Sequence, residues 1–61
     1  MSDRKLIEWL ALKLVANEGI EAIWNLYTIA AEAHRAGHFE IAADFMEIAD
    51  AAEREWRRRG G

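Results

Sequence analysis

The sequence contains no cysteine and no proline, and only four of its 61 residues are glycine. Without cysteine it has no disulfide framework and no zinc site built on thiolates. It has no run of about 18 uncharged residues, so it lacks a segment able to span a membrane. We expect residues 1–4 not to begin a signal peptide, because Glu8 and Lys13 interrupt the apolar sequence that follows. No targeting segment assigns the chain to a compartment, and we expect it to be soluble.

Positively charged residues are also fewer than negatively charged ones, with 8 Lys and Arg against 11 Asp and Glu. The net charge is −3 at pH 7 and the isoelectric point is about 5.2, which argues against a broad nucleic-acid-binding surface. Hydrophobic residues make up 52% of the chain, and many of them are alanine, which favours helix over strand. A chain of this length forms one domain, residues 1–61, and buries only roughly 60% of its unfolded surface.

Capping and turn residues divide the chain into three helices. Ser2 or Asp3 is expected to cap the first helix, and Asn17-Glu18-Gly19 to form the first turn. Gly37 is expected to end the second helix, with His38 capping the third. Because two short turns favour antiparallel neighbours, the sequence predicts an all-α, up-down-up antiparallel three-helix bundle. Its helices lie at about 3–17, 20–36 and 39–58, and residues 60–61 form a flexible tail.

The hydrophobic pattern predicts which faces are buried. In residues 20–35 the polar side chains occupy well under half of the helix circumference, so we expect this segment to be the central helix of the domain. In the first helix, Leu6, Leu10 and Leu14, with Ile7 beside them, form the expected core stripe. The opposite side of that helix is also apolar and is therefore expected to be exposed; it carries Trp9, Leu12 and Ala16.

Two apolar rows are candidates for binding a partner protein, because Trp and Tyr concentrate at interface hot spots. The first row is Trp9, Leu12 and Ala16. The second follows one edge of the middle helix and comprises Ile20, Trp24, Tyr27, Thr28, Ala31 and Arg35. A groove between the first two helices would present both rows as one patch. The alternative is that Trp24 and Tyr27 pack against a neighbouring helix as part of the core.

Other chemistries have little support. His34 and His38 have a spacing that can hold zinc on a continuous helix, but Gly37 lies between them and should make the two rings diverge. No hydroxyl side chain has a histidine and a carboxylate at a spacing that indicates a catalytic triad. We therefore expect no metal, no cofactor and no enzymatic activity.

Part of the chain resembles a known helical repeat. The pattern Leu26-x-x-Ile29-Ala30, then Gly37-x-Phe39-x-x-Ala42-x-x-x-Met46-x-x-Ala49, resembles one tetratricopeptide-repeat hairpin over residues 26–49. Ala33 stands where that family has an aromatic residue, and one unit cannot form the peptide groove of a repeat array.

The whole chain also resembles a de novo designed three-helix mini-protein, because caps, turns and helix-end charges are mutually consistent. Such proteins are most often made as binders, so the resemblance implies a protein-binding module with a protein partner. The alternative is a self-assembling or idealised helical scaffold, whose partner is a second copy.

Overall fold

The computed structural model describes residues 3–60, which form three α-helices and no strand. These are α1 (Arg4–Glu18), α2 (Ile20–Arg35) and α3 (Phe39–Arg58). The all-α class and the three-helix bundle are confirmed, and each predicted helix boundary lies within one residue of the observed one. Residues 1, 2 and 61 lie outside the described residues, so Ser2 as a cap and Gly61 as part of a tail are not described.

Local signals set the helix ends as expected. The Asp3 carboxylate accepts hydrogen bonds from the backbone N–H groups of Lys5 (3.0 Å) and Leu6 (3.3 Å) and so caps α1. After α2, Gly37 has a φ of 87°, and the N–H groups of Gly37 and His38 donate to the carbonyls of His34 and Ala33. This pattern is a Schellman motif, which ends the helix at the predicted glycine. His38 occupies the N-cap position before α3, as expected, but its side chain makes no capping hydrogen bond.

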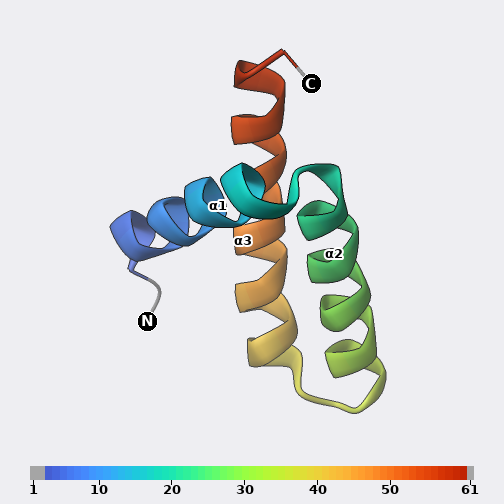
Figure 1. Cartoon of the computed structure of the whole chain (residues 1–61). Helices are drawn as coiled ribbons and strands as arrows, with labels where there is room; N and C mark the ends of the chain where they lie inside the picture. The colour runs from blue at the N-terminus through green and yellow to red at the C-terminus, as the bar shows by residue number, and fades with distance from the viewer. Residues whose placement is uncertain (1–2, 61) are drawn as a thin grey trace.

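The connection between α1 and α2 is shorter than the expected three-residue turn. α1 continues through Asn17 and Glu18, so Gly19 alone joins the two helices. One residue is too short to fold a helix back alongside its predecessor. α2 and α3 form the expected antiparallel pair, whereas α1 is inclined steeply across α3 (Figure 1).

The helix at the centre of the domain is α3, not α2 as the apolar pattern suggested. α3 packs extensively against both other helices, while α1 and α2 meet over a much smaller area. Because α1 crosses the α2–α3 pair near the Gly19 corner, the part of α2 that approaches Gly37 has only one neighbouring helix (Figure 1). The surplus apolar surface of α2 is therefore left uncovered there.

The core is built from small side chains. Ala11 and Val15 of α1 are 1% and 4% exposed, and they pack in one cluster with Ile23, Leu26, Ala49, Ala51 and Ala52. The predicted α1 core stripe is therefore wrong in part: Ile7 and Leu14 pack against this cluster, but Leu6 is 52% exposed. Helices that cross steeply approach most closely at one point, which favours alanine over leucine there.

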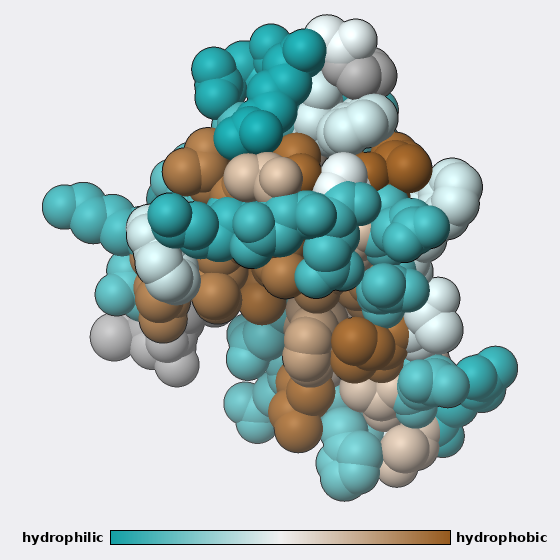
Figure 2. All heavy atoms as spheres, viewed as in Figure 1, coloured by the Kyte–Doolittle hydropathy of each residue, from teal (hydrophilic) through white to brown (hydrophobic). Residues whose placement is uncertain are grey.

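Hydropathy follows this arrangement on the surface. Figure 2 shows hydrophilic atoms along the outward side of α1 and at the C-terminal end of α3. Hydrophobic atoms gather under α1 and over part of the lower half of the α2–α3 pair. Four large apolar residues of the hairpin half remote from α1 are exposed as well: Ile29, Phe39, Ile41 and Met46.

Candidate functional site: an apolar groove between α2 and α3

An open groove of about 630 Å³ lies between α2 and α3. We call it the α2–α3 groove. It is mostly apolar, and α1 contributes no residue to it. Four alanines line it: Ala30 and Ala42 are buried and form its floor, whereas Ala31 and Ala43 are exposed. Its lining residues are Tyr27, Ala30, Ala31, His34, Arg35, Phe39, Ala42, Ala43 and Met46.

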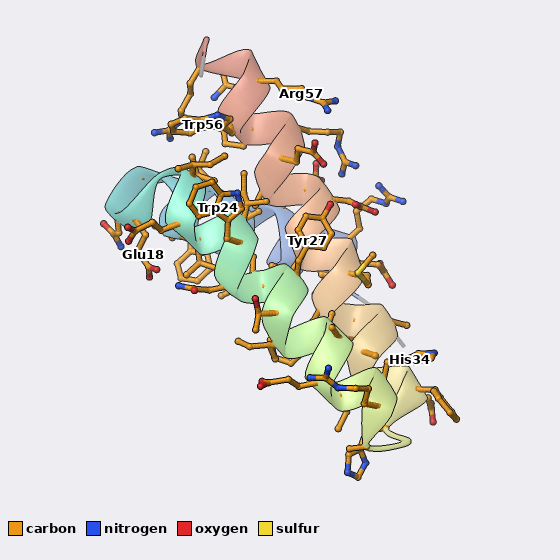
Figure 3. The ribbon with its side chains drawn as sticks, turned by 90° about the vertical axis from the view of Figure 1, so that its right-hand side faces the viewer. Glu18, Trp24, Tyr27, His34, Trp56 and Arg57 are labelled. Carbon is orange, nitrogen blue, oxygen red and sulfur yellow. The ribbon has the colours of Figure 1, made fainter. Side chains whose placement is uncertain are left out.

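Tyr27 closes the end of the groove nearer to Gly19. It points from α2 towards α3, and its hydroxyl lies 3.2 Å from both Asp50 Oδ1 and Glu53 Oε1, which share its single proton in a three-centre hydrogen bond (Figure 3). Glu53 is held in turn by Arg57, whose Nη2 lies 2.7 Å from Glu53 Oε2. The side chain of Tyr27 thus joins the two helices through a polar contact while its ring lines the groove and packs against the core.

This environment favours the neutral form of the tyrosine. Burial raises the pKa of Tyr27 above its ordinary value of 10.0, and the hydrogen bonds to Asp50 and Glu53 raise it further. A tyrosinate at this position would have no proton to donate and would face two carboxylates. The hydroxyl therefore acts as a hydrogen-bond donor between helices rather than as an acid near neutral pH.

Exposed aromatic and thioether side chains lie in the groove and next to it. Trp24 does not line the groove, but it is 62% exposed and lies one turn before Tyr27 on the same side of α2 (Figure 3). Phe39 is 61% exposed and meets the His34 ring edge-on, with 4.9 Å between ring centroids. Met46 is also exposed. Exposed aromatic residues beside a hollow lined by small side chains are typical of a protein-binding surface.

Of the residues predicted to bind a partner, three lie together in this groove: Tyr27, Ala31 and Arg35. Trp24 is exposed and is therefore not part of the core. Tyr27 is half-buried and also lines the groove, so it belongs both to the core and to the candidate binding surface. Ile20 packs against the core instead. Thr28 is exposed on α2, and its hydroxyl donates to the Trp24 carbonyl (2.9 Å).

The α1 row remains a separate surface. Trp9 is 53% exposed and Leu12 36% exposed, and Ala16 is exposed too, as the sequence predicted. The Lys13 ammonium lies 5.9 Å from the centre of a Trp9 ring, a cation–π contact. The expected groove that would join this row to Trp24 and Tyr27 is not the one observed, which lies between α2 and α3.

Sequence reasoning missed the α3 half of the site. Phe39, Ala42, Ala43 and Met46 line the groove, and His34 joins them from α2. The sequence pattern places Phe39, Ala42 and Met46 only in the apolar arc of the third helix. The available signal was the width of that arc, which covers more of α3 than one neighbouring helix can bury at the Gly37 end.

The C-terminal end of α3 carries a second charged arrangement. The Glu55 carboxylate accepts hydrogen bonds from Arg58 Nη2 (2.7 Å) and Arg59 Nε (2.6 Å). Arg58 and then Arg59 hold the pKa of Glu55 at about 2, below its ordinary 4.5. These pairs lie within one helix, and the arginines also complement the helix dipole. This end therefore stabilises the helix, and both Arg58 and Arg59 are already paired with Glu55.

Other kinds of site have no counterpart in the part of the chain that the structure describes. Within residues 3–60, no three His, Asp or Glu side chains come together as potential metal ligands. None of the three described helices is long and apolar enough to cross a membrane. Comparison with family models, curated protein sequences and solved structures finds no match.

Proposed function

We propose that this chain is a protein-binding module that presents the α2–α3 groove and the adjacent Trp24 to a partner protein. One observation carries the proposal: an uncovered apolar groove with an alanine floor, which the exposed Phe39 and Met46 help to line. A designed binder, which the whole sequence resembles, has the same purpose. The α1 row around Trp9 is then a second, smaller contact surface.

The groove is held on rigid elements, which supports a binding role. Both walls are helices, and the Tyr27 hydroxyl fixes one relative to the other through Asp50 and Glu53. The Schellman motif at Gly37 fixes their other end. A surface that is ordered before binding loses little conformational entropy when the partner arrives, so more of the contact energy appears as affinity.

A self-assembling scaffold is the second candidate, favoured by the large exposed apolar residues Leu6, Ile29 and Ile41 outside the groove. Light scattering on a sizing column separates the two functions. A species of 7.0 kDa at all concentrations from micromolar to millimolar supports the binder. A stable dimer or larger species supports self-assembly and contradicts the proposed function.

Selection from a naive display library of helical peptides tests the proposed function directly. We expect the selected peptides to compete with one another for one surface. Their affinity for the Ala31→Glu variant should be at least about tenfold lower than for the wild type, because a bound peptide would bury the new carboxylate in the apolar groove. Ala31 is exposed in the free chain, so the variant should keep its helicity in circular dichroism.

Asn25→Glu is the matched control. Asn25 is also exposed on α2, does not line the groove, and receives the same new charge. Its affinity for the selected peptides should equal that of the wild type. Peptides that bind the Ala31→Glu variant as well as they bind the wild type would contradict the assignment of this groove as the binding surface.

A further inference from the structure

The groove has an end-to-end difference in charge. At the Tyr27 end, the Asp50 and Glu53 carboxylates already accept the tyrosine hydroxyl, and Glu53 also pairs with Arg57. At the other end, the Arg35 guanidinium lines the groove and makes no ion pair with any residue in the described range 3–60. The groove therefore offers one uncompensated cation, beside the imidazole of His34.

We propose that the occupant of the α2–α3 groove is an amphipathic α-helix of a partner protein, with an acidic side chain at the end of its apolar stripe that pairs with Arg35. This inference rests on the proposed function and adds the chemistry of the partner.

The shape of the groove selects a helix. Two antiparallel helices with an alanine floor leave the position that a further helix occupies in a bundle, and small floor residues leave room for large side chains on the incoming helix. The helical backbones of α2 and α3 satisfy their own hydrogen bonds, so neither wall offers a free edge to a β-strand. Binding is therefore through side chains.

The length of the groove sets the spacing of the partner residues. Tyr27, Ala31 and Arg35 lie four residues apart on one side of α2 and span about 12 Å, or slightly more than two helical turns. Three apolar side chains on successive turns of the partner helix cover the stretch from Tyr27 to Phe39. The acidic side chain then lies within one turn of the last apolar residue, where Arg35 can reach it.

The chain's own exposed apolar helix fits this description poorly. The α1 row carries Lys13 next to Trp9, so a second copy docking by this row would place an ammonium near the Arg35 guanidinium. Like charges at a contact oppose that pairing. The charge pattern therefore disfavours a second copy that docks by its α1 row.

A charge-swap selection tests the inference. Peptides selected from the naive helical library against the wild type should be enriched in Asp or Glu at one end of the apolar stripe. Replacing that acid by its amide should weaken binding by up to about fivefold, the upper end of the range for an exposed ion pair. Selection against Arg35→Glu should enrich Lys or Arg at the same position, and Arg35→Gln should remove the preference.

Lys5→Glu is the control, because it reverses an exposed charge on α1 and should leave the selected sequences unchanged. If groove-binding peptides are selected without the acidic preference, the inference fails while the proposed function stands. If no peptide binds in the groove, both fail. If the chain forms a dimer that the Ala31→Glu variant abolishes, the occupant is a second copy, and the inference is overturned.

Discussion

Tyr27 has two roles that conflict at high pH. Its ring lines the groove while its hydroxyl donates to Asp50 and Glu53, so the fold depends on the phenol keeping its proton. Because the folded pKa lies above 10.0, the contribution of this group to stability is complete below pH 10 and is lost as the pH rises through the folded pKa.

Tyr27 is the only tyrosine of the chain, so an ultraviolet absorbance titration reports it alone. We expect the tyrosinate band of the native protein to appear above pH 10 and that of the denatured protein near pH 10. Tyr27→Phe should cost about 0.5–1.5 kcal/mol of unfolding free energy near neutral pH, the net value of a hydrogen bond. A native titration at or below pH 10 would contradict the interhelical hydrogen bonds.

Glu55 shows the opposite pH dependence. Its folded pKa of about 2 lies below the ordinary 4.5, so its contribution to stability is present above pH 4.5 and is lost as the pH falls from 4.5 towards 2. In that range, thermal unfolding followed by circular dichroism should show a steeper fall in midpoint for the wild type than for Glu55→Gln. Parallel curves would mean that the pairs with Arg58 and Arg59 do not persist in solution.

At the scale of the elements, the corner between α1 and α2 depends on one residue. Gly19 has φ 66° and ψ −142°, the mirror image of the polyproline II conformation and a region used essentially by glycine alone. An L-alanine Cβ at this position would meet Trp56 Cζ3 at 3.6 Å, an ordinary contact, so the cost of the substitution comes from the backbone and not from a clash.

We therefore expect Gly19→Ala to lower the unfolding free energy by about 1–3 kcal/mol. Chemical synthesis provides a sharper control: D-alanine at position 19 favours this backbone conformation and should be tolerated far better than L-alanine. Urea unfolding of the two variants measures the difference. Equal destabilisation by both enantiomers would show that the absence of any side chain, and not the backbone conformation, sets the requirement for glycine.

The helices themselves follow from local chemistry, which explains why the sequence predicts their ends within one residue. Asp3 and Gly37 act on their own backbone neighbours, and no distant contact is needed. The direction of α1 does not follow from such local signals alone. It depends on whether Asn17 and Glu18 belong to the helix or to the turn. Because they belong to the helix, Gly19 is the only connecting residue.

At the scale of the whole molecule, the burial of α1 could not be read from residue size. Leu6 has more apolar area than Ala11, yet Ala11 is buried and Leu6 is exposed. Two helices that cross steeply are close together only near one point, and a small side chain at that point lets them approach each other. The groove was hidden for the same reason: only the position of α1 shows which half of the α2–α3 pair stays uncovered. Tyr27, Ala31 and Arg35 were nevertheless found, since one helix edge carries all three.

The small core should make the whole chain unfold together. A domain of 61 residues has a free energy of unfolding of about 3–9 kcal/mol. Ala11 is 1% exposed within the cluster that holds Ile23 and Ala52, so Ala11→Glu places an unpaired carboxylate at the contact of all three helices. Such a charge costs about 3–5 kcal/mol, which is at least a third of that stability and exceeds all of it at the lower end of the range.

We expect Ala11→Glu to abolish the helical signal of the entire chain in circular dichroism, and Ala16→Glu, on the exposed side of the same helix, to change stability by less than about 0.5 kcal/mol. The size of the loss is informative, because α1 contributes 15 helical residues against 16 in α2 and 20 in α3. A loss limited to the share of α1 would mean that α2 and α3 stay folded without it. The groove would then belong to an independent helical hairpin, and α1 would only add to its stability.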